Sequence, residues 1–237
     1  MTQLLDLVLE AHGAARWKRF RSIEGDMSIT GLLWARKGWP DVLKNVRVIA
    51  DIAEQHITYQ PFTAEGLRSD YRPDRVAIDA FDGKHLKQRA NPREAFAGHR
   101  PETPWDDLHL AYFSGYAMWN YLNTPFMFAL PGFATEEIEP WDESGATWRR
   151  LRVTFPESVA THSPEQVFYV GNDGLIGRLD YFANVTGGVP TAHYMSDYRD
   201  FDGIKIPTKR RAYVRKPDGM PVDTIGVAID IAAIRLS

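Results

Sequence analysis

"HYMSDYRDFDGIKIPTKRRAYVRKPDGMPVDTIGVAIDIAAI", residues 193–234, is the stretch that decides the fold. Two short turn signals divide it, Asp202-Gly203 and the KPDG sequence at 216–219. Short turns of this kind join strands that are neighbours in a sheet. Successive strands joined in this way form an antiparallel meander, and the stretch therefore predicts an antiparallel sheet.

The same pattern recurs earlier in the chain. In QVFYVGNDGLIGRLDYFANV (166–185) the GNDG sequence joins two strand-like segments, and in DRVAIDAFDGKHLKQRAN (74–91) Asp82-Gly83 suits a tight turn with positive φ. Before these, Val46, Val48, Ala50 and Ile52 alternate with polar residues, which is typical of a half-buried strand. GNDGLIG is therefore interpreted as a hairpin and not as a nucleotide-binding loop.

Two helices interrupt the strand pattern. Residues 3–15 have apolar residues at helical spacing, with Gly13 as a natural terminator. TPWDDLHLAYFSGYAMWNYLNTPF (103–126) lies between prolines and predicts one helix over about 105–122. We expect a single α+β domain over 1–237, in which a strongly curved antiparallel sheet, a half-barrel, has its concave face covered by helices. Its expected parts are the N-terminal helix 3–15, early strands 21–90, a helical insertion over about 104–132 and late strands 147–235.

Composition narrows the function. The chain has 237 residues, 44% of them hydrophobic, so it can bury a substantial core. Its net charge of −3 lacks the broad positive field that nucleic-acid binding requires, and the basic run at 208–216 is interpreted as a solvated strand face. The absence of cysteine excludes disulfides, thiolate catalysis and cysteine metal sites. No secretory leader or integral membrane segment is recognisable, so a cytoplasmic location is expected.

The helix carries the candidate site. His109, Tyr112 or Phe113, Tyr116, Trp119 and Asn120 fall on one stripe at helical spacing. Two interpretations stay open: the rings are core residues with satisfied polar tips, or they line a cavity in which His109, Tyr116 and Asn120 orient a ligand. The predicted ligand-binding residues are Tyr112, Phe113, Tyr116, Trp119, Asn120, His162, Tyr181 and His193.

Other features of the helix also allow two interpretations. Asp106 or Asp107 either caps the helix or orients His109 as an acid or base, and His109, Asp106 and Tyr116 are the catalytic candidates. Gly115, on the side opposite the stripe, allows close backbone approach. The apolar segment at 124–133 is either a lid or a buried loop.

The remaining histidines give no metal signal. His99, His162 and His193 lack the spacing of metal ligands, and no metal or cofactor is expected. His193 lies on a strand whose inward-facing side the sequence leaves open. No GxSxG elbow is present, which excludes a standard α/β-hydrolase.

The order of helix, strands, helical insertion and strands resembles the lipoprotein-carrier fold of LolA and LolB, an incomplete β-barrel capped by helices around an apolar cavity. AHGAARWKRFRSIEGDMSITG (11–31), FYVGNDGLIGRLDYFANV (168–185) and YRDFDGIKIPTKRRAYV (198–214) look like the strand sequences of uncharacterised bacterial proteins related to that superfamily. The chain departs from carriers by lacking an export signal and a lipobox cysteine, which favours a cytosolic branch. Its helix is also richer in histidine, tyrosine and tryptophan than an acyl-chain cavity requires, so the transport function is not transferred.

Two functions follow as expectations. The first is binding of a hydrophobic or aromatic small molecule or lipid in a cavity between the curved sheet and the helix. The second is a cofactor-independent enzyme that uses histidine, tyrosine and aspartate for acid–base work on an apolar substrate. A structural or interaction role would instead require a large exposed apolar patch. The sequence leaves the ligand, the reaction and the oligomeric state open.

Overall fold

The computed structural model describes residues 3–237, and within this range thirteen strands form one antiparallel sheet. The strand order is β6-β5-β4-β3-β2-β1-β13-β12-β11-β10-β9-β8-β7, so β6 and β7 are the two open edges. The first group comprises β1 (Ser22–Thr30), β2 (Leu43–Asp51), β3 (Ile57–Gln60), β4 (Leu67–Arg72), β5 (Arg75–Ala80) and β6 (His85–Ala90). The second comprises β7 (Ala134–Glu143), β8 (Ala146–Thr154), β9 (Glu165–Val170), β10 (Ile176–Ala183), β11 (Val189–Phe201), β12 (Ile204–Arg215) and β13 (Pro221–Leu236).

Short turns produce this order, as the sequence predicted. Asp202 (φ 53°) and Gly203 (φ 85°) form the two-residue connection between β11 and β12. Positive φ at both positions matches the twist of the flanking strands. Gly83 also has a positive φ, 90°, between β5 and β6. The predicted antiparallel meander is therefore confirmed.

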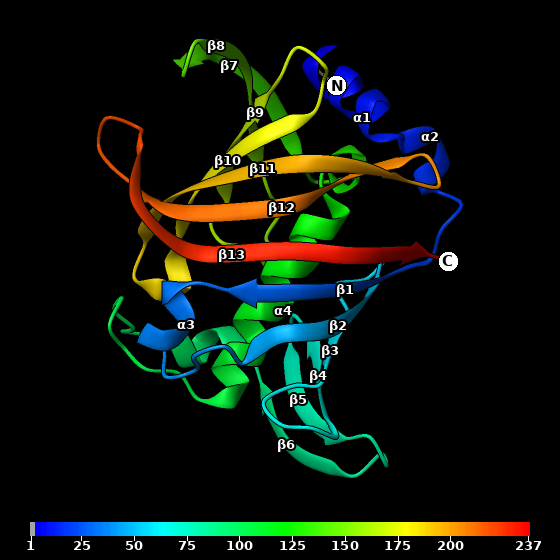
Figure 1. Ribbon diagram of the computed structural model, residues 1–237, viewed down its shortest axis with the longest axis vertical. Helices are drawn as coiled ribbons and strands as arrows, with labels where there is room; N and C mark the ends of the chain where they lie inside the picture. The colour runs from blue at the N-terminus through cyan, green and yellow to red at the C-terminus, as the bar shows by residue number, and fades with distance from the viewer. Residues whose placement is uncertain (1–2) are drawn as a thin grey trace.

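The chain crosses the sheet once. Strands β1 to β6 run outward to one edge, and β7 to β13 return from the opposite edge until β13 pairs with β1. The connection between β6 and β7 must therefore pass over a face of the sheet, and it contains the longest helix, α4 (Asp107–Asn123). Figure 1 shows α4 running across strands β12, β13 and β1 on the far side of the sheet.

The other helices are short. They are α1 (Gln3–His12), α2 (Ala14–Trp17), α3 (Leu32–Arg36) and the 3-10 helices η1 (Pro92–Phe96), η2 (Phe126–Ala129) and η3 (Asn184–Thr186). The N-terminal helix ends before Gly13, whose φ is 93°. None of the helices within residues 3–237 is long and apolar enough to span a membrane.

Strand β7 and helix α3 differ from the sequence expectation. Strand β7 starts the late group at Ala134, earlier than the expected residue 147, and most of its side chains are exposed. An edge strand with two solvated faces has no alternation of apolar and polar residues, so its sequence carries little strand signal. Helix α3 was not expected because five residues are too few for a helical period to be recognised.

Helix α4 is buried on all sides, with fifteen of its 17 residues in the interior. A Cβ atom at Gly115 would lie only 2.4 Å from Cγ of Tyr71, so the predicted close approach at this glycine is confirmed. The Tyr59 hydroxyl donates to the Ser114 carbonyl at 2.9 Å from β3. From β12, Arg210 Nη2 donates to the Tyr121 carbonyl at 2.9 Å. Strands from both groups thus contact the same helix.

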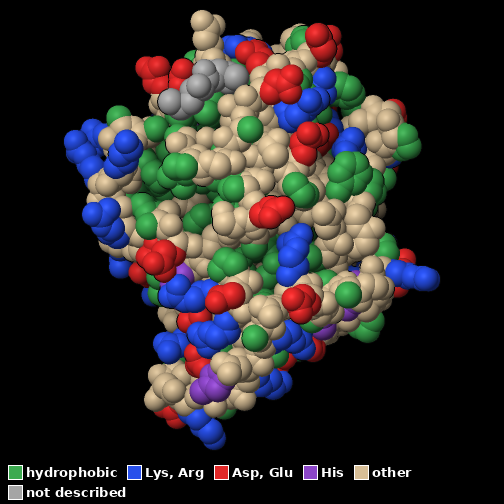
Figure 2. Space-filling view, turned by 180° about the vertical axis from the view of Figure 1, so that it is seen from behind, with side chains coloured by type: hydrophobic (Ala, Val, Ile, Leu, Met, Phe, Trp, Pro, Cys, Tyr) green, Lys and Arg blue, Asp and Glu red, His purple; other side chains and the backbone are tan. Residues whose placement is uncertain are grey.

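The surface on the rear face carries charges of both signs. Figure 2 shows Lys and Arg side chains interspersed with Asp and Glu side chains over this face, with hydrophobic side chains between them. This mixture agrees with the net charge of −3.

Candidate functional site

A buried group of rings lies between α4 and the sheet. The Tyr116 hydroxyl lies 2.9 Å from Nδ1 of His162, and the Tyr121 hydroxyl lies 2.8 Å from its Nε2. Tyr121 also contacts the Tyr181 hydroxyl at 3.2 Å, and the rings of His162 and Tyr181 stack with centroids 4.0 Å apart. We call Tyr116, Tyr121, His162 and Tyr181 the tyrosine–histidine cluster.

The cluster satisfies its polar atoms internally. One ring nitrogen of a neutral imidazole donates and the other accepts, so one tyrosine hydroxyl accepts from His162 and the other donates to it. Burial, followed by the nearby positive charge of Arg93, lowers the pKa of His162 to about 3. Burial also raises the pKa of Tyr121 to about 12. These groups are therefore neutral near pH 7.

His193 extends this region toward β12. Its ring packs edge-on against Tyr121, with the ring centroids 4.7 Å apart. The side chain of His193 therefore lies on the face of the sheet that carries α4, a choice that the sequence left open. Neither ring nitrogen has a hydrogen-bond partner within residues 3–237, and burial, followed by the charge of Arg210, holds the pKa of His193 well below its usual value. Arg210, only 3% exposed, lies at the C-terminal end of α4, where its charge meets free carbonyls and the negative end of the helix dipole.

The other end of α4 is held by Asp106 and His109. Asp106 is the N-cap, and its carboxylate accepts from the His109 backbone N–H at 2.8 Å. His109 Nδ1 accepts from the Asp106 backbone N–H at 3.3 Å, and Nε2 lies 3.1 Å from the Ala95 carbonyl. Partial burial would raise the pKa of Asp106, but hydrogen bonds from Arg89 and from the His109 backbone hold it below its usual value. Asp106 thus caps the helix, and its Oδ1 also lies 2.7 Å from Nδ1 of His109, which is the contact that the second interpretation requires.

The rest of the predicted stripe is bonded mainly to backbone groups. Trp119 Nε1 donates to the Asp51 carbonyl at 2.7 Å, and Asn120 Nδ2 donates to the carbonyls of Tyr116 and Ala160 at 2.7 and 2.8 Å. Arg93 Nη1 lies 3.4 Å from the Tyr112 hydroxyl. In these places ring and amide groups fix the position of α4 against its surroundings.

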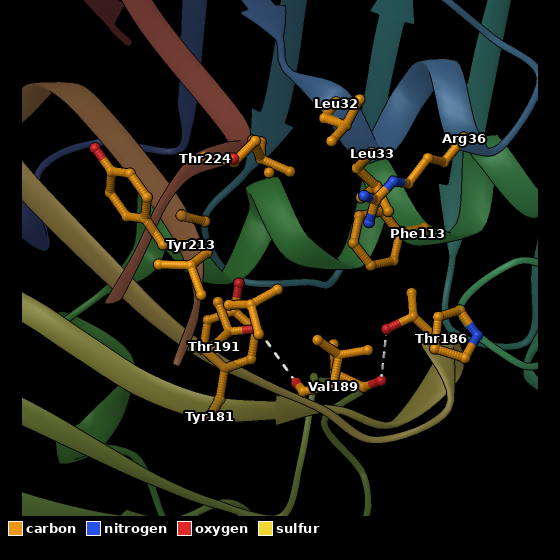
Figure 3. A pocket seen from close by; sticks show the side chains of 17 residues that line it. Leu32, Leu33, Arg36, Phe113, Tyr181, Thr186, Val189, Thr191, Tyr213 and Thr224 are labelled. Atoms are coloured by element: carbon orange, nitrogen blue, oxygen red, sulfur yellow. Dashed lines mark hydrogen bonds between the residues drawn. The ribbon is translucent and has the colours of Figure 1, made fainter. Parts of the chain in front are cut away.

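The structure contains a pocket that sequence reasoning did not locate. It opens between α3 and strands β10 to β13 and has a volume of about 320 Å³ (Figure 3). We call it the α3 pocket. It is lined by Leu32, Leu33, Arg36, Pro101, Phe113, Tyr181, Ala183, Thr186, Val189, Thr191, Ala212, Tyr213, Val214, Val222, Thr224, Gly226 and Val227.

A smaller space continues the pocket toward α4. It measures about 30 Å³ and shares Phe113, Tyr181 and Val227 with the α3 pocket. Tyr59 and Tyr121 also line it, so it reaches the tyrosine–histidine cluster. Of the predicted ligand-binding residues, Phe113 and Tyr181 line the α3 pocket, whereas the others stand behind its wall or along α4.

Backbone packing forms the rim of the pocket. Gly31 precedes α3 with a φ of 119°, and a Cβ there would lie 2.4 Å from the Gly226 carbonyl oxygen, so only glycine lets α3 approach β13 this closely. At the other end of α3, the buried Lys37 ammonium donates to the carbonyls of Pro101 and Thr103 at 2.8 and 2.9 Å. Because Pro101 also lines the pocket, this contact fixes one wall.

The apolar segment at 124–133 lies elsewhere. Phe126 stacks on Trp17 with centroids 4.0 Å apart, and Phe128 packs against Phe168 at 4.7 Å. Residues 126–128 are buried, and the lining of the α3 pocket contains none of this segment. This part of the segment is therefore a buried loop. No group of three or more His, Asp or Glu side chains in residues 3–237 is arranged to hold a metal ion.

Comparisons with solved structures identify the architecture. A domain named for outer membrane lipoprotein sorting, from Vibrio parahaemolyticus, is 9% identical with a TM-score of 0.55 and covers 98% of this chain and 92% of its own. A DUF1329 family protein from Desulfovibrio piger is 13% identical, with a TM-score of 0.54 and coverages of 99% and 92%. A LolA superfamily protein from Nitrosomonas europaea is 10% identical, with a TM-score of 0.52 and coverages of 98% and 93%. No protein-family model and no curated protein matches the sequence. The chain therefore has a LolA-like fold, as its sequence order predicted.

Proposed function

We propose that the protein binds a hydrophobic small molecule or lipid in the α3 pocket, with the apolar part of the ligand directed toward α4. The observation that carries this proposal is a pocket of about 320 Å³ lined mainly by aliphatic and aromatic side chains. Pockets for small molecules typically measure about 300–1,000 Å³ and combine apolar walls with a few polar groups. In this proposal the face that carries α4 is the concave face of the half-barrel.

The pocket also has room to deepen. The smaller space of about 30 Å³ lies directly behind Phe113 and Tyr181. A rotation of either ring would join the two spaces and lengthen the cavity toward Tyr121, since side-chain rotamers change readily when a ligand binds. An apolar chain longer than the open pocket would then fit against α4.

The solved structures with this fold support the proposal in one respect. The protein from Vibrio parahaemolyticus is named for outer membrane lipoprotein sorting. Because identity is only 9%, the likeness concerns the fold, and transfer of a hydrophobic ligand to this chain is part of the proposal. The predicted cytoplasmic location belongs to it as well, and fractionation of the native host tests that part.

The proposal assigns different tasks to the predicted site residues. Phe113 and Tyr181 contact the ligand, because both line the pocket. Tyr116, His162 and His193 hold Tyr181 and Tyr121 in place from behind the wall, and Tyr112, Trp119 and Asn120 hold α4. Asp106 and His109 stabilise the start of α4.

A neutral fluorescent probe tests ligand binding. N-phenyl-1-naphthylamine should bind the native protein. Val214→Trp should weaken this binding by about tenfold or more, because the indole fills the mouth of the pocket. A tenfold change corresponds to a loss of roughly 1.4 kcal/mol of binding free energy. Val214 lines the pocket and is 40% exposed, so the larger side chain can be accommodated without unfolding. Ile49→Trp is the matched control, since Ile49 is 36% exposed on β2 and does not line the pocket. Equal binding by both variants would reject the α3 pocket as the site.

One observation favours acid–base catalysis as a second candidate. The hydrogen bonds from Tyr116 through His162 and Tyr121 end at Tyr181, which lines the pocket. However, an acid–base catalyst works best with a pKa near the operating pH. Burial places the pKa of His162 at about 3 and that of Tyr121 at about 12, which favours binding over turnover.

A further inference from the structure

We infer that the ligand of the α3 pocket is an amphiphile with an anionic head group, which the Arg36 guanidinium binds at the rim. The inference rests on the proposed function and adds the chemical class of the ligand.

The charge distribution of the pocket carries this inference. Arg36 is the only charged residue among the 17 that line it, and the lining contains no aspartate or glutamate. A cationic ligand would therefore meet repulsion without a counter-charge, whereas an anionic head group would meet one positive charge at the mouth of an apolar space.

Arg36 also lacks a partner of its own. Within residues 3–237 its guanidinium takes part in neither a hydrogen bond nor an ion pair. Several exposed arginines of the sheet are instead paired with carboxylates, for example Arg47 with Asp26 at 2.8 Å and Arg149 with Glu137 at 2.7 Å. Among the unpaired arginines of residues 3–237, Arg36 is the one that lines the pocket.

The direction of the side chain is consistent with this role. Figure 3 shows Arg36 extending from α3 past Leu33 toward Phe113, so that its nitrogens lie beside the apolar wall. The planar guanidinium offers donors in a fork that matches the two oxygens of a carboxylate or the oxygens of a phosphate. An alkyl chain running inward from a head group at this position would contact Phe113.

Two of the threonine hydroxyls of the rim are already bonded to the backbone. Thr186 Oγ1 donates to the Ala183 carbonyl at 2.9 Å, and Thr191 Oγ1 donates to the Val189 carbonyl at 3.2 Å. Their hydrogens are thus already used. The neighbouring cation, Lys37, is buried and donates to backbone carbonyls of the 100–103 segment. Arg36 is therefore the free charged donor at the pocket.

Calorimetric titration with four probes tests the inference: dodecanoate, dodecyl phosphate, dodecanol and inorganic phosphate. The native protein should bind dodecanoate or dodecyl phosphate about tenfold more tightly than dodecanol, since a hydrogen-bonded charge typically contributes this much. The better of the two anionic probes identifies the head group. Arg36→Gln should bring the affinities for dodecanoate and dodecyl phosphate down to that for dodecanol, and Arg36→Lys should retain part of the preference.

Arg19→Gln is the matched control, because Arg19 is exposed, unpaired within residues 3–237 and absent from the pocket lining. Equal affinity of native protein for dodecanoate and dodecanol, or the same anion preference in Arg36→Gln, would overturn the inference while leaving the proposed function standing. Binding of inorganic phosphate alone with an affinity equal to dodecyl phosphate would also overturn it, since no apolar chain would then be needed. If no dodecyl compound and no N-phenyl-1-naphthylamine bound, both the inference and the proposed function would fail.

Discussion

The tyrosine–histidine cluster and the α3 pocket share Tyr181 but differ in how their polar groups are paired. In the cluster, His162 accepts and donates between two tyrosine hydroxyls, and the rings stack at 4.0 Å so that little space is left. In the pocket, threonine hydroxyls turn back to backbone carbonyls and about 320 Å³ stays open. Aromatic richness alone therefore does not indicate a binding site; the placement of hydrogen-bond partners decides whether rings fill a space or line it.

The largest expected effect comes from breaking the cluster with His162→Leu. The change leaves the Tyr116 hydroxyl buried without a partner and removes one partner of Tyr121. Each buried polar group left unsatisfied costs about 1–3 kcal/mol, so the free energy of unfolding should fall by about 2–4 kcal/mol in urea denaturation.

Binding to the folded fraction distinguishes the two regions in this variant. His162 does not line the α3 pocket, so the dissociation constant for N-phenyl-1-naphthylamine should stay close to native at a temperature where the variant is folded. If the variant kept native stability but lost probe binding, the cluster would contact the ligand directly. That result would contradict the assignment of ligand binding to the α3 pocket and of a supporting role to the cluster.

A second effect, smaller for each histidine taken alone, is a loss of stability in mild acid. Burial is the main cause that lowers the pKa of His162 to about 3 and that of His12 to about 4, and it also lowers the pKa of His193. The pKa of histidine in the unfolded chain is about 6.5. As the pH falls below this value, the histidines of the unfolded chain bind protons, whereas the buried histidines of the folded protein stay neutral. The free energy of unfolding is therefore highest above about pH 6.5. Below that pH, each of these histidines lowers it by up to about 1.4 kcal/mol for each pH unit of acidification.

Urea denaturation at pH 7, 6 and 5 measures this slope, and His162→Leu should lower it by about 1.4 kcal/mol per pH unit. Affinity for the neutral probe should not change over this range, because no histidine lines the α3 pocket. An NMR titration in which the His162 ring protonated near pH 6.5 in the folded protein would contradict the prediction.

The smallest effect is expected at the residue that the two regions share. Tyr181→Phe removes the hydroxyl contact to Tyr121 at 3.2 Å but keeps the ring against His162 and the pocket. Stability should fall by about 1 kcal/mol, and probe affinity should stay within about twofold. A tenfold loss of affinity without loss of stability would assign the hydroxyl to the ligand. Loss of a measurable turnover would favour the enzymatic alternative.

Much of the fold was predictable from local patterns. Asp202 and Gly203 have the backbone conformation that a two-residue hairpin requires, and Val46, Val48 and Ala50 are buried as their alternation indicates. The edge strand β7 was missed because its exposed faces give no alternation. The site was predictable only in part: the ring-rich helix was recognised, but Tyr121, placed away from the stripe, bonds to His162 because α4 is buried on all sides.

The sequence by itself determined the antiparallel meander and the position of α4 along the chain, because each follows from residues near one another in the chain. Only the tertiary structure decided which rings are packed solid and where space remains. The α3 pocket depends on contacts between distant segments, such as Gly31 with Gly226 and Lys37 with the carbonyls of Pro101 and Thr103. An open space is a property of how such segments meet, and no single stretch of sequence contains it.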